Sequence, residues 1–398
     1  MLLKNTMGGV LLIAGTAIGA AVLALPIQTA ALGFTYSLTA LVLCWGLMTI
    51  GALLVLEANL LIGQGTNLIT MAQRTLGPVG QMLTWLSYLF LFYTLSAAYL
   101  SGAGAWVQRG LQALGLIWPH TAAAFLVLLL VSMLLISGTR FIDWCNRALM
   151  ILLLGAFITL LVTTTGHLAP SLLWEQPAQL LPQSLPMMIT AFGFAIIVPS
   201  LTEYLPGNAR QLRNMVLIGS AFPIVLYGLW QMIILGTLPQ TTLLHLLEQG
   251  HSATQLSHSL AQTLNEPTIT LTATLFSIFA LTTSILGVSL SLFDFLADGL
   301  NINKTLPNKG YVALLTFLPP FLLVMLYPQG FEFALSFAAL FVSVMLGILP
   351  ALMVWRARYH LQLTGPFQVW GGKPILILTM LCFMGIIAIE LFNVWQVF

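Results

Sequence analysis

Long runs of apolar residues, separated by short polar segments, dominate this sequence of 398 residues. A helix needs about 20 such residues to cross the hydrocarbon core of a bilayer. The runs also lack the polar alternation that is typical of transmembrane β-barrel strands. The pattern therefore predicts an all-α integral membrane protein with eleven transmembrane helices, at 5–31, 34–62, 79–108, 120–138, 141–164, 183–205, 211–237, 268–297, 310–327, 331–355 and 374–397.

The low charge content excludes several other classes of protein. Only 6% of the residues are charged, against roughly a quarter in a soluble domain. A net charge of +2 is too small for a nucleic-acid-binding surface. Cys44, Cys145 and Cys382 show no CxxC spacing, so the sequence indicates neither a zinc site nor a disulfide framework. We expect no nucleic-acid partner, no metal and no cofactor.

The basic residues orient these spans, because positively charged loops remain in the cytoplasm. With the N-terminus inside, eleven of the twelve Lys and Arg residues fall on the cytoplasmic side and only Arg109 falls outside. The largest external loop, 238–267, contains two stretches with helical amphipathic patterns, Thr241–Gln249 and Ser252–Leu264. This loop is either a lid on the external face or a plain connector. The C-terminus is predicted to be external.

Two of the spans contain segments that are poor helix formers. The first contains the stretch GTAIGAAVLALP from Gly15 to Pro26, and the sixth contains FGFAIIVPSLTEYL from Phe192 to Leu205. Irregular backbone at membrane depth is tolerated only where it lines a cavity or is buried in protein. Close packing of helices through small residues is the alternative explanation for the first stretch.

The spacing of the two breaks indicates an inverted repeat. Five spans separate the start of the first broken helix from the start of the second, so two five-helix units would have opposite topology. We predict a first repeat at 1–164, a second at 183–355 and an additional helix at 374–397. Half-helix ends that face a common centre would offer free N–H and C=O groups to a small zwitterion.

Four motifs resemble the hydroxy and aromatic amino-acid permease family of the amino acid–polyamine–organocation superfamily, and most closely its tyrosine-specific members. They are GTAIGAAVLALP, LLVLEANLL around Glu57, FGFAIIVPSLTEYLPGNARQLR and LTTSILGVSLSLFDFLADGL. The resemblance implies the fold of the sodium-coupled leucine transporter, location in a bacterial inner membrane and function as a monomer.

Site residues follow from this resemblance and from the breaks. The predicted substrate-binding residues lie in spans 1, 3, 6 and 8: Gly15, Thr16, Ala17, Gly19, Tyr93, Ser96, Phe192, Gly193, Phe194 and Thr282. Ala280, Thr283 and Ser284 resemble the sodium-site arrangement of that fold. For the hydroxyl residues of span 8, bonding to the preceding helical turn is the alternative. Family members usually have His after FGF, where this chain has Ala195, and many proton-coupled relatives have Lys in span 5, where Leu153 stands.

Acidic residues inside apolar segments are candidates for proton carriage or gating, because they are costly to insert. Glu57, Glu203 and Asp294 lie near the predicted inner face, where the candidate partners are Arg140, Arg147, Arg210 and Arg213. Glu390 lies deep in the last span, and the sequence offers it no partner.

The sequence favours a secondary transporter that imports tyrosine or a related aromatic amino acid by cation symport, with a proton or sodium ion as the coupling ion. A serine/threonine or tryptophan symporter of the same family is the nearest alternative. An intramembrane enzyme would need a catalytic set at depth, and a channel would need a filter motif. Neither pattern is present in the sequence, so we predict that the protein is not an enzyme.

Overall fold

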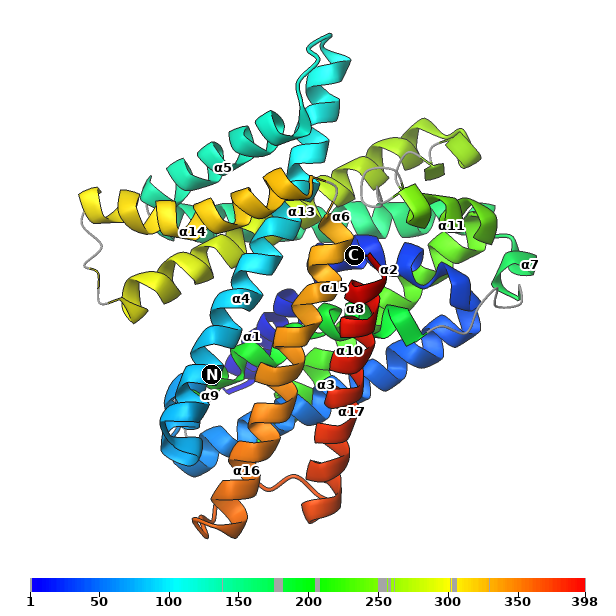
Figure 1. Ribbon diagram of the computed structural model, residues 1–398. Coiled ribbons are helices and arrows are strands. Elements are labelled where there is room, and N and C mark those ends of the chain that lie inside the picture. Colours follow the sequence, from blue (N-terminus) through cyan, green and yellow to red (C-terminus); the bar gives the residue numbers. More distant parts are fainter. Residues whose placement is uncertain are drawn as a thin grey trace.

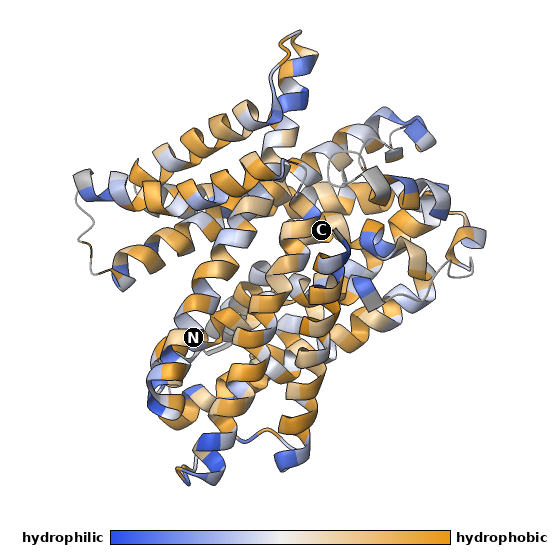
Figure 2. Ribbon diagram, in the orientation of Figure 1, coloured by the Kyte–Doolittle hydropathy of each residue, from blue (hydrophilic) through white to orange (hydrophobic). Residues whose placement is uncertain are grey.

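The computed structural model describes residues 2–137, 139–174, 182–204, 208–249, 256, 259–260, 262–300, 302, 306–328 and 330–397. Every regular element within these ranges is a helix, and they contain no strand. Hydrophobic residues run along most of the helices, and hydrophilic residues gather at the helix ends and in the loops (Figure 2). This distribution fits a multi-pass membrane protein.

The first half of the chain begins with a bent pair of helices. Helix α1 (Leu2–Ala17) and helix α2 (Ala21–Gln28) differ in direction by 54°. They are followed by η1 (Ala30–Leu32), α3 (Gly33–Ile62), α4 (Leu68–Ala113), α5 (His120–Ser137), α6 (Thr139–Thr164), η2 (Thr165–His167) and α7 (Pro170–Leu173). Figure 1 shows the arrangement of these helices, with α1 drawn between α4 and α15 in this view.

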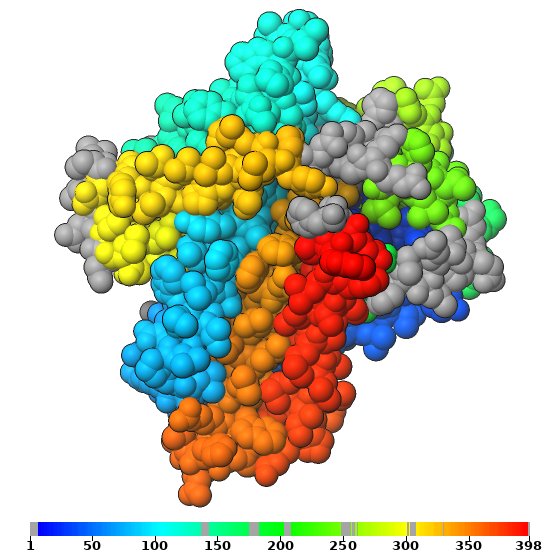
Figure 3. Space-filling view, viewed as in Figure 1, coloured from blue at the N-terminus to red at the C-terminus, as the bar shows by residue number. Residues whose placement is uncertain are grey.

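The second half contains another interrupted helix. It comprises η3 (Pro182–Ser184), α8 (Leu185–Ala191), the 3₁₀ segment η4 (Gly193–Ile197) and α9 (Val198–Tyr204). Then come α10 (Ala209–Thr237), α11 (Gln240–Gln249), α13 (Pro267–Gly299), α14 (Leu306–Leu326), α15 (Phe331–Val342), the π-helix η5 (Ser343–Ile348), α16 (Leu349–Tyr359) and α17 (Gly372–Val397). Helix α17 lies on the face of the bundle beside α15 and α16 (Figure 3).

The number of membrane-crossing helices agrees with the prediction in part. Among the described residues, nine helices are long and apolar enough to cross a bilayer, and the bent pair makes a tenth. Helix α5 is apolar but shorter. The predicted start of the third span, residue 79, lies just after Gly77, where a φ of 79° kinks α4. Only glycine adopts such an angle without strain.

The π-helix inside the tenth predicted span packs closely against two other helices at glycine positions. A Cβ atom added to Gly347 would lie 2.2 Å from the ring of Phe383 on α17. A Cβ atom on Gly51 of α3 would likewise lie 2.5 Å from the carbonyl oxygen of Leu346. The absence of side chains at these two glycines lets three helices approach closely, and π-bulges often occur at functional sites.

Candidate functional site

The two broken helices meet through one tyrosine side chain. Tyr227 on α10 is fully buried, and its hydroxyl lies 2.6 Å from the carbonyl oxygen of Ala17 and 3.0 Å from that of Ala191. Ala17 is the last residue of α1, and Ala191 is the last residue of α8. A phenol has one proton, so it satisfies one carbonyl at a time. At this centre two carbonyl oxygens therefore share one hydroxyl donor.

The Tyr227 hydroxyl and the two helix ends that it contacts are buried. The last carbonyls of a helix have no partner within the helix, and here apolar neighbours exclude water from both ends. The Tyr227 ring packs against Phe192, with 5.3 Å between the ring centroids. Phe192 follows Ala191 directly, so the residue immediately after the end of α8 packs against the ring of Tyr227.

A second cross-link joins the first break to α13. The backbone N–H of Ala20 donates to the Oγ of Ser284 over 2.8 Å, and that hydroxyl donates to the carbonyl of Ala280. A Cβ atom on Gly19 would lie only 3.0 Å from the Ser284 Oγ. Glycine at position 19 thus allows α13 to approach the break.

The structure places some predicted substrate residues at this centre. Ala17 contributes its carbonyl to it, and Gly19 borders Ser284. Phe192 and Phe194 are fully buried, whereas a Cβ atom on Gly193 would meet nothing within 4 Å. Open space beside Gly193 is compatible with a ligand there.

Other predicted substrate residues have different surroundings. Tyr93 donates its hydroxyl to the carbonyl of Leu315 on α14, away from the breaks. Thr16 is exposed and bonds to the carbonyl of Leu12. The nearest neighbour of a Cβ atom on Gly15 would be the Met150 methyl at 3.5 Å. Ser96 is buried, and no described residue forms a hydrogen bond with its Oγ.

The hydroxyl residues of α13 follow the helical alternative for the most part. Thr282 donates to the carbonyl of Ile278, and Thr283 donates to the carbonyls of Phe279 and Ala280. Ser284 differs because it also accepts a bond from Ala20, in the break between α1 and α2. Ala280 and Thr283 lie in the buried face of α13. Their role in cation binding stays a prediction.

Sequence reasoning missed an aromatic cluster beside Tyr227. Trp230 lies one turn further along α10, 4.9 Å from the ring of Phe276 on α13 and 6.3 Å from that of Phe157 on α6. Its indole Nε1 is buried without a hydrogen-bond partner among the described residues. The i, i+3 spacing of Tyr227 and Trp230 places both on one helix face and was the available signal.

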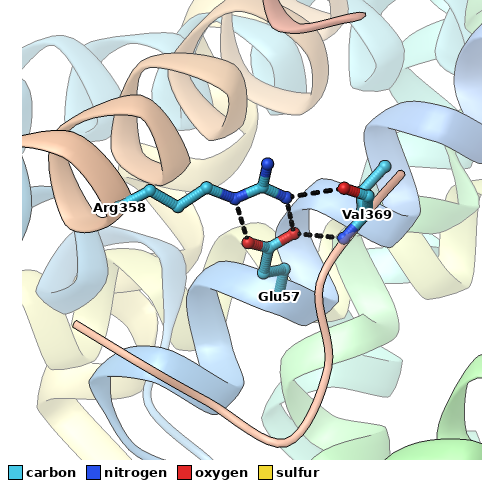
Figure 4. Close-up of polar contacts among 3 residues, drawn as sticks. All are labelled: Glu57, Arg358 and Val369. Carbon is cyan, nitrogen blue, oxygen red and sulfur yellow. Dashed lines mark hydrogen bonds and ion pairs between the residues drawn. The ribbon is translucent and has the colours of Figure 1, made fainter. Parts of the chain in front are cut away.

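Glu57 is bound by a residue that the sequence did not suggest as a partner. Its carboxylate, 1% exposed, forms a two-pronged ion pair with Arg358 of α16, with both N–O distances at 2.5 Å. The N–H of Val369 donates to the same carboxylate, and Arg358 donates to the carbonyl of Val369 (Figure 4). The network therefore ties α3, the end of α16 and the loop before α17 together. Two-pronged pairs of this kind are among the strongest polar contacts.

The remaining gating candidates are less defined. The side chain of Glu203 lies outside the described residues, as do those of Arg140 and Asp143. Asp294 is half-buried on α13. In the loop 238–267, α11 confirms the first predicted helical stretch, and Gln240 donates to the carbonyl of Ala30 next to α2. Most of the second stretch lies outside the described residues.

A comparison with protein families identifies this architecture. The model of the tryptophan/tyrosine permease family matches residues 3–390. The chain belongs to the tryptophan/tyrosine permease family. The resemblance deduced from the four motifs is thereby confirmed, and so is the prediction that the protein is not an enzyme.

Individual relatives of this family match over nearly their whole length. Tyrosine-specific transport system 1 of Haemophilus influenzae is 33% identical over 95% of this chain and 94% of its own. Tyrosine-specific transport system 2 of the same species is 34% identical over 99% and 98%. The tryptophan-specific transport protein of Shigella flexneri is 31% identical over 96% and 93%. The family's permeases therefore share the full extent of this chain.

Proposed function

We propose that this permease imports tyrosine or a related aromatic amino acid across a bacterial inner membrane by cation symport. The support comes from relatives that are named as tyrosine-specific and tryptophan-specific transport proteins. It comes equally from the single observation that carries the mechanism: Tyr227 joins the carbonyl ends of both broken helices. Alternating access would then be a movement of the elements around this centre.

The proposed architecture has eleven spans in two inverted five-helix repeats. The first repeat would contain the bent pair α1/α2 through α6, the second α8 through α16, and α17 would be additional. The N-terminus would be cytoplasmic and the C-terminus external. The positions of the two breaks, each at the first span of its unit, support this division. The site would lie within one chain, which is compatible with a functional monomer.

The chemistry of the centre suits an α-amino acid. Carbonyl oxygens of Ala17 and Ala191 would accept hydrogen bonds from a substrate ammonium group. The start of α2, where the helix dipole is positive, would face the carboxylate. Phe192, Phe194 and the Trp230 cluster would supply apolar walls for a flat ring, since aromatic rings gain additional energy from stacked or edge-to-face contact.

The coupling ion would be a proton or sodium. Leu153 is fully buried and carries no charge, so α6 provides no ammonium group at that depth. Ala280, Thr283 and Ser284 remain the candidate cation residues, and Glu57, Glu203 and Asp294 remain candidates for gating or proton carriage. The Arg358 pair makes a gating role the stronger one for Glu57, since its carboxylate is already neutralised by a fixed cation.

Tryptophan is the second candidate substrate. The family includes relatives named for tryptophan transport, and the unpartnered Trp230 indole offers a hydrogen-bond donor near the proposed ring pocket. The phenol hydroxyl of a tyrosine substrate would accept a hydrogen bond from the Trp230 indole, whereas the indole N–H of a tryptophan substrate would not. This difference favours tyrosine. Serine and threonine have no ring that could pack against these aromatic side chains.

Uptake into proteoliposomes tests the proposal directly. Labelled tyrosine, tryptophan and serine would be supplied under an inward proton gradient or an inward sodium gradient, imposed separately. Accumulation of tyrosine under one of them, with competition by tryptophan and none by serine, is expected. Absence of both tyrosine uptake and tyrosine counterflow would refute the substrate. Ser284→Ala should reduce uptake several-fold. Ser291→Ala is the matched control, because Ser291 is exposed on the same helix and donates to the carbonyl of Gly287, one turn before it.

A further inference from the structure

Glu390 is a buried carboxyl group on an otherwise apolar helix. The residue is 1% exposed, and α17 contains no other acidic residue. The cation of its own helix is Lys373, 17 residues away, which corresponds to roughly 25 Å along a helix. Lys373 instead lies over the rings of Trp355 and Tyr359. Glu390 is therefore remote from the positive charge of α17.

The hydrogen-bond partners of Glu390 are neutral. Ser336 of α15 donates to its Oε2 over 2.7 Å, and the side-chain nitrogen of Asn393 donates to the same oxygen over 3.3 Å. That nitrogen also lies 3.2 Å from the carbonyl oxygen of Gln183, which fixes the orientation of the amide. The carboxyl thus joins α15 and α17 through neutral donors.

The helices packed on α17 bring no cation to this level. Residues 331–355 and 182–204, which include α15, η5, η3 and α8, contain no Lys or Arg. The charged group of α15 is Glu332, 7% exposed and one helical turn before Ser336. The other titratable groups of the packed elements lie on α16 and α3: Arg356, Arg358, Tyr359, Tyr36, Cys44 and Glu57. Arg358 is already paired with Glu57. This pair lies at the C-terminal end of α16, where Lys373 contacts the ring of Tyr359.

We propose that Glu390 is a proton-binding site and that its carboxyl group is protonated, and so uncharged, at neutral pH. An ionised carboxylate in apolar surroundings is disfavoured unless a cation compensates it, and the second acid on α15 adds no compensation. A metal cation is a poorer occupant than a proton. Ser336 and Asn393 both direct hydrogen atoms at the carboxyl oxygen, whereas a hard cation needs several oxygen lone pairs directed at it.

This site lies outside the centre formed by Tyr227, and it does not depend on which amino acid the permease carries. Because Ser336 belongs to α15 and Glu390 to α17, the proton would be held where a helix of the proposed second repeat meets the additional helix. Release of the proton would leave a negative charge between these two helices. A movement that separates α15 from α17 would change the surroundings of the carboxyl group, and the fraction of Glu390 that is protonated would change with it.

Infrared spectroscopy of the full-length protein in liposomes tests the inference without requiring transport. Wild type minus Glu390→Gln should show a protonated carboxyl C=O band at pH 7. Glu332→Gln is the matched control, and the band should persist in that variant. If the band is missing in the wild type at pH 7, or persists in Glu390→Gln, the proposal is overturned. Loss of the band on addition of sodium at constant pH would also overturn it, since sodium would then be the occupant.

A second variant covers the case in which Glu390→Gln does not fold. Ser336→Ala removes one donor and retains the carboxyl group, so the same band should remain and shift in frequency. An unchanged frequency would show that the band does not arise from Glu390 and would overturn the assignment. Uptake by the wild type is measured on the same liposomes, so a failure of the proposed transport is recognised separately.

Discussion

Removal of one oxygen atom from Tyr227 provides the most direct test of the central geometry. In Tyr227→Phe the ring keeps its contact with Phe192, but the carbonyls of Ala17 and Ala191 lose the hydroxyl at 2.6 and 3.0 Å. A buried polar group left unsatisfied costs about 1–3 kcal/mol. We expect the folded state to lose stability of this order, and the two half-helix ends to separate.

The same magnitude translates into substrate affinity. If the carbonyls bind the substrate ammonium, their loss of alignment should raise Kd by roughly 5- to 150-fold, since each 1.4 kcal/mol is tenfold. The assay is competition binding in detergent with tyrosine, tyramine and 3-(4-hydroxyphenyl)propionate. The penalty should appear for tyrosine and tyramine, which carry the ammonium group, and should be absent for the des-amino acid.

A matched control separates this effect from the effect of removing a tyrosine hydroxyl elsewhere in the protein. Tyr93→Phe deletes the same oxygen, but at a hydroxyl that bonds to Leu315 on α14. Its Kd for tyrosine should stay within about twofold of the wild-type value. Such a change is well below the tenfold change that corresponds to about 1.4 kcal/mol. Equal affinity of Tyr227→Phe and wild type, tighter binding by the variant, or an equal penalty for the des-amino acid would refute the reasoning.

Two further substitutions test the packing that positions the site. Glu57→Gln leaves Arg358 buried without its counter-charge, and removal of one partner from a buried pair costs about 3–5 kcal/mol. The melting temperature in detergent should fall clearly, and an unchanged value would show that the pair is not needed. Gly347→Ala should also destabilise, because its Cβ would lie 2.2 Å from the Phe383 ring. Gly46→Ala is the control, since its Cβ meets nothing within 4 Å, and equal melting temperatures for the two variants would contradict the steric argument.

The positions of the long apolar helices along the chain were largely predictable. Hydrophobicity is a local property, so long apolar runs could be located residue by residue, and the ends of α3 and α10 agree closely with the predicted spans 34–62 and 211–237. The breaks after Ala17 and Ala191 were also predictable, because weakly helical residues act on the backbone next to them.

The candidate site was predictable in its backbone and less so in its side chains. Ala17, Gly19 and Phe192, which were predicted to bind substrate, lie beside Tyr227 or Ser284, and their role in binding stays a prediction. Tyr227 was not singled out, because its role depends on two carbonyls 210 and 36 residues away. The π-helix at 343–348 was also missed, and so was the close approach of α17 at Gly347, which depends on how whole helices pack.

By itself, the sequence determined that the chain is an all-helical membrane protein, where its helices run and where two of them break. These properties arise from the transfer of apolar residues into lipid and from the local conformational preferences of glycine and proline. The tertiary structure alone decided which polar groups meet. Glu57 pairs with Arg358 across 301 residues, and Glu390 pairs with Ser336 across 54. Such partners depend on the rotation and depth of whole helices, which packing of the complete bundle sets.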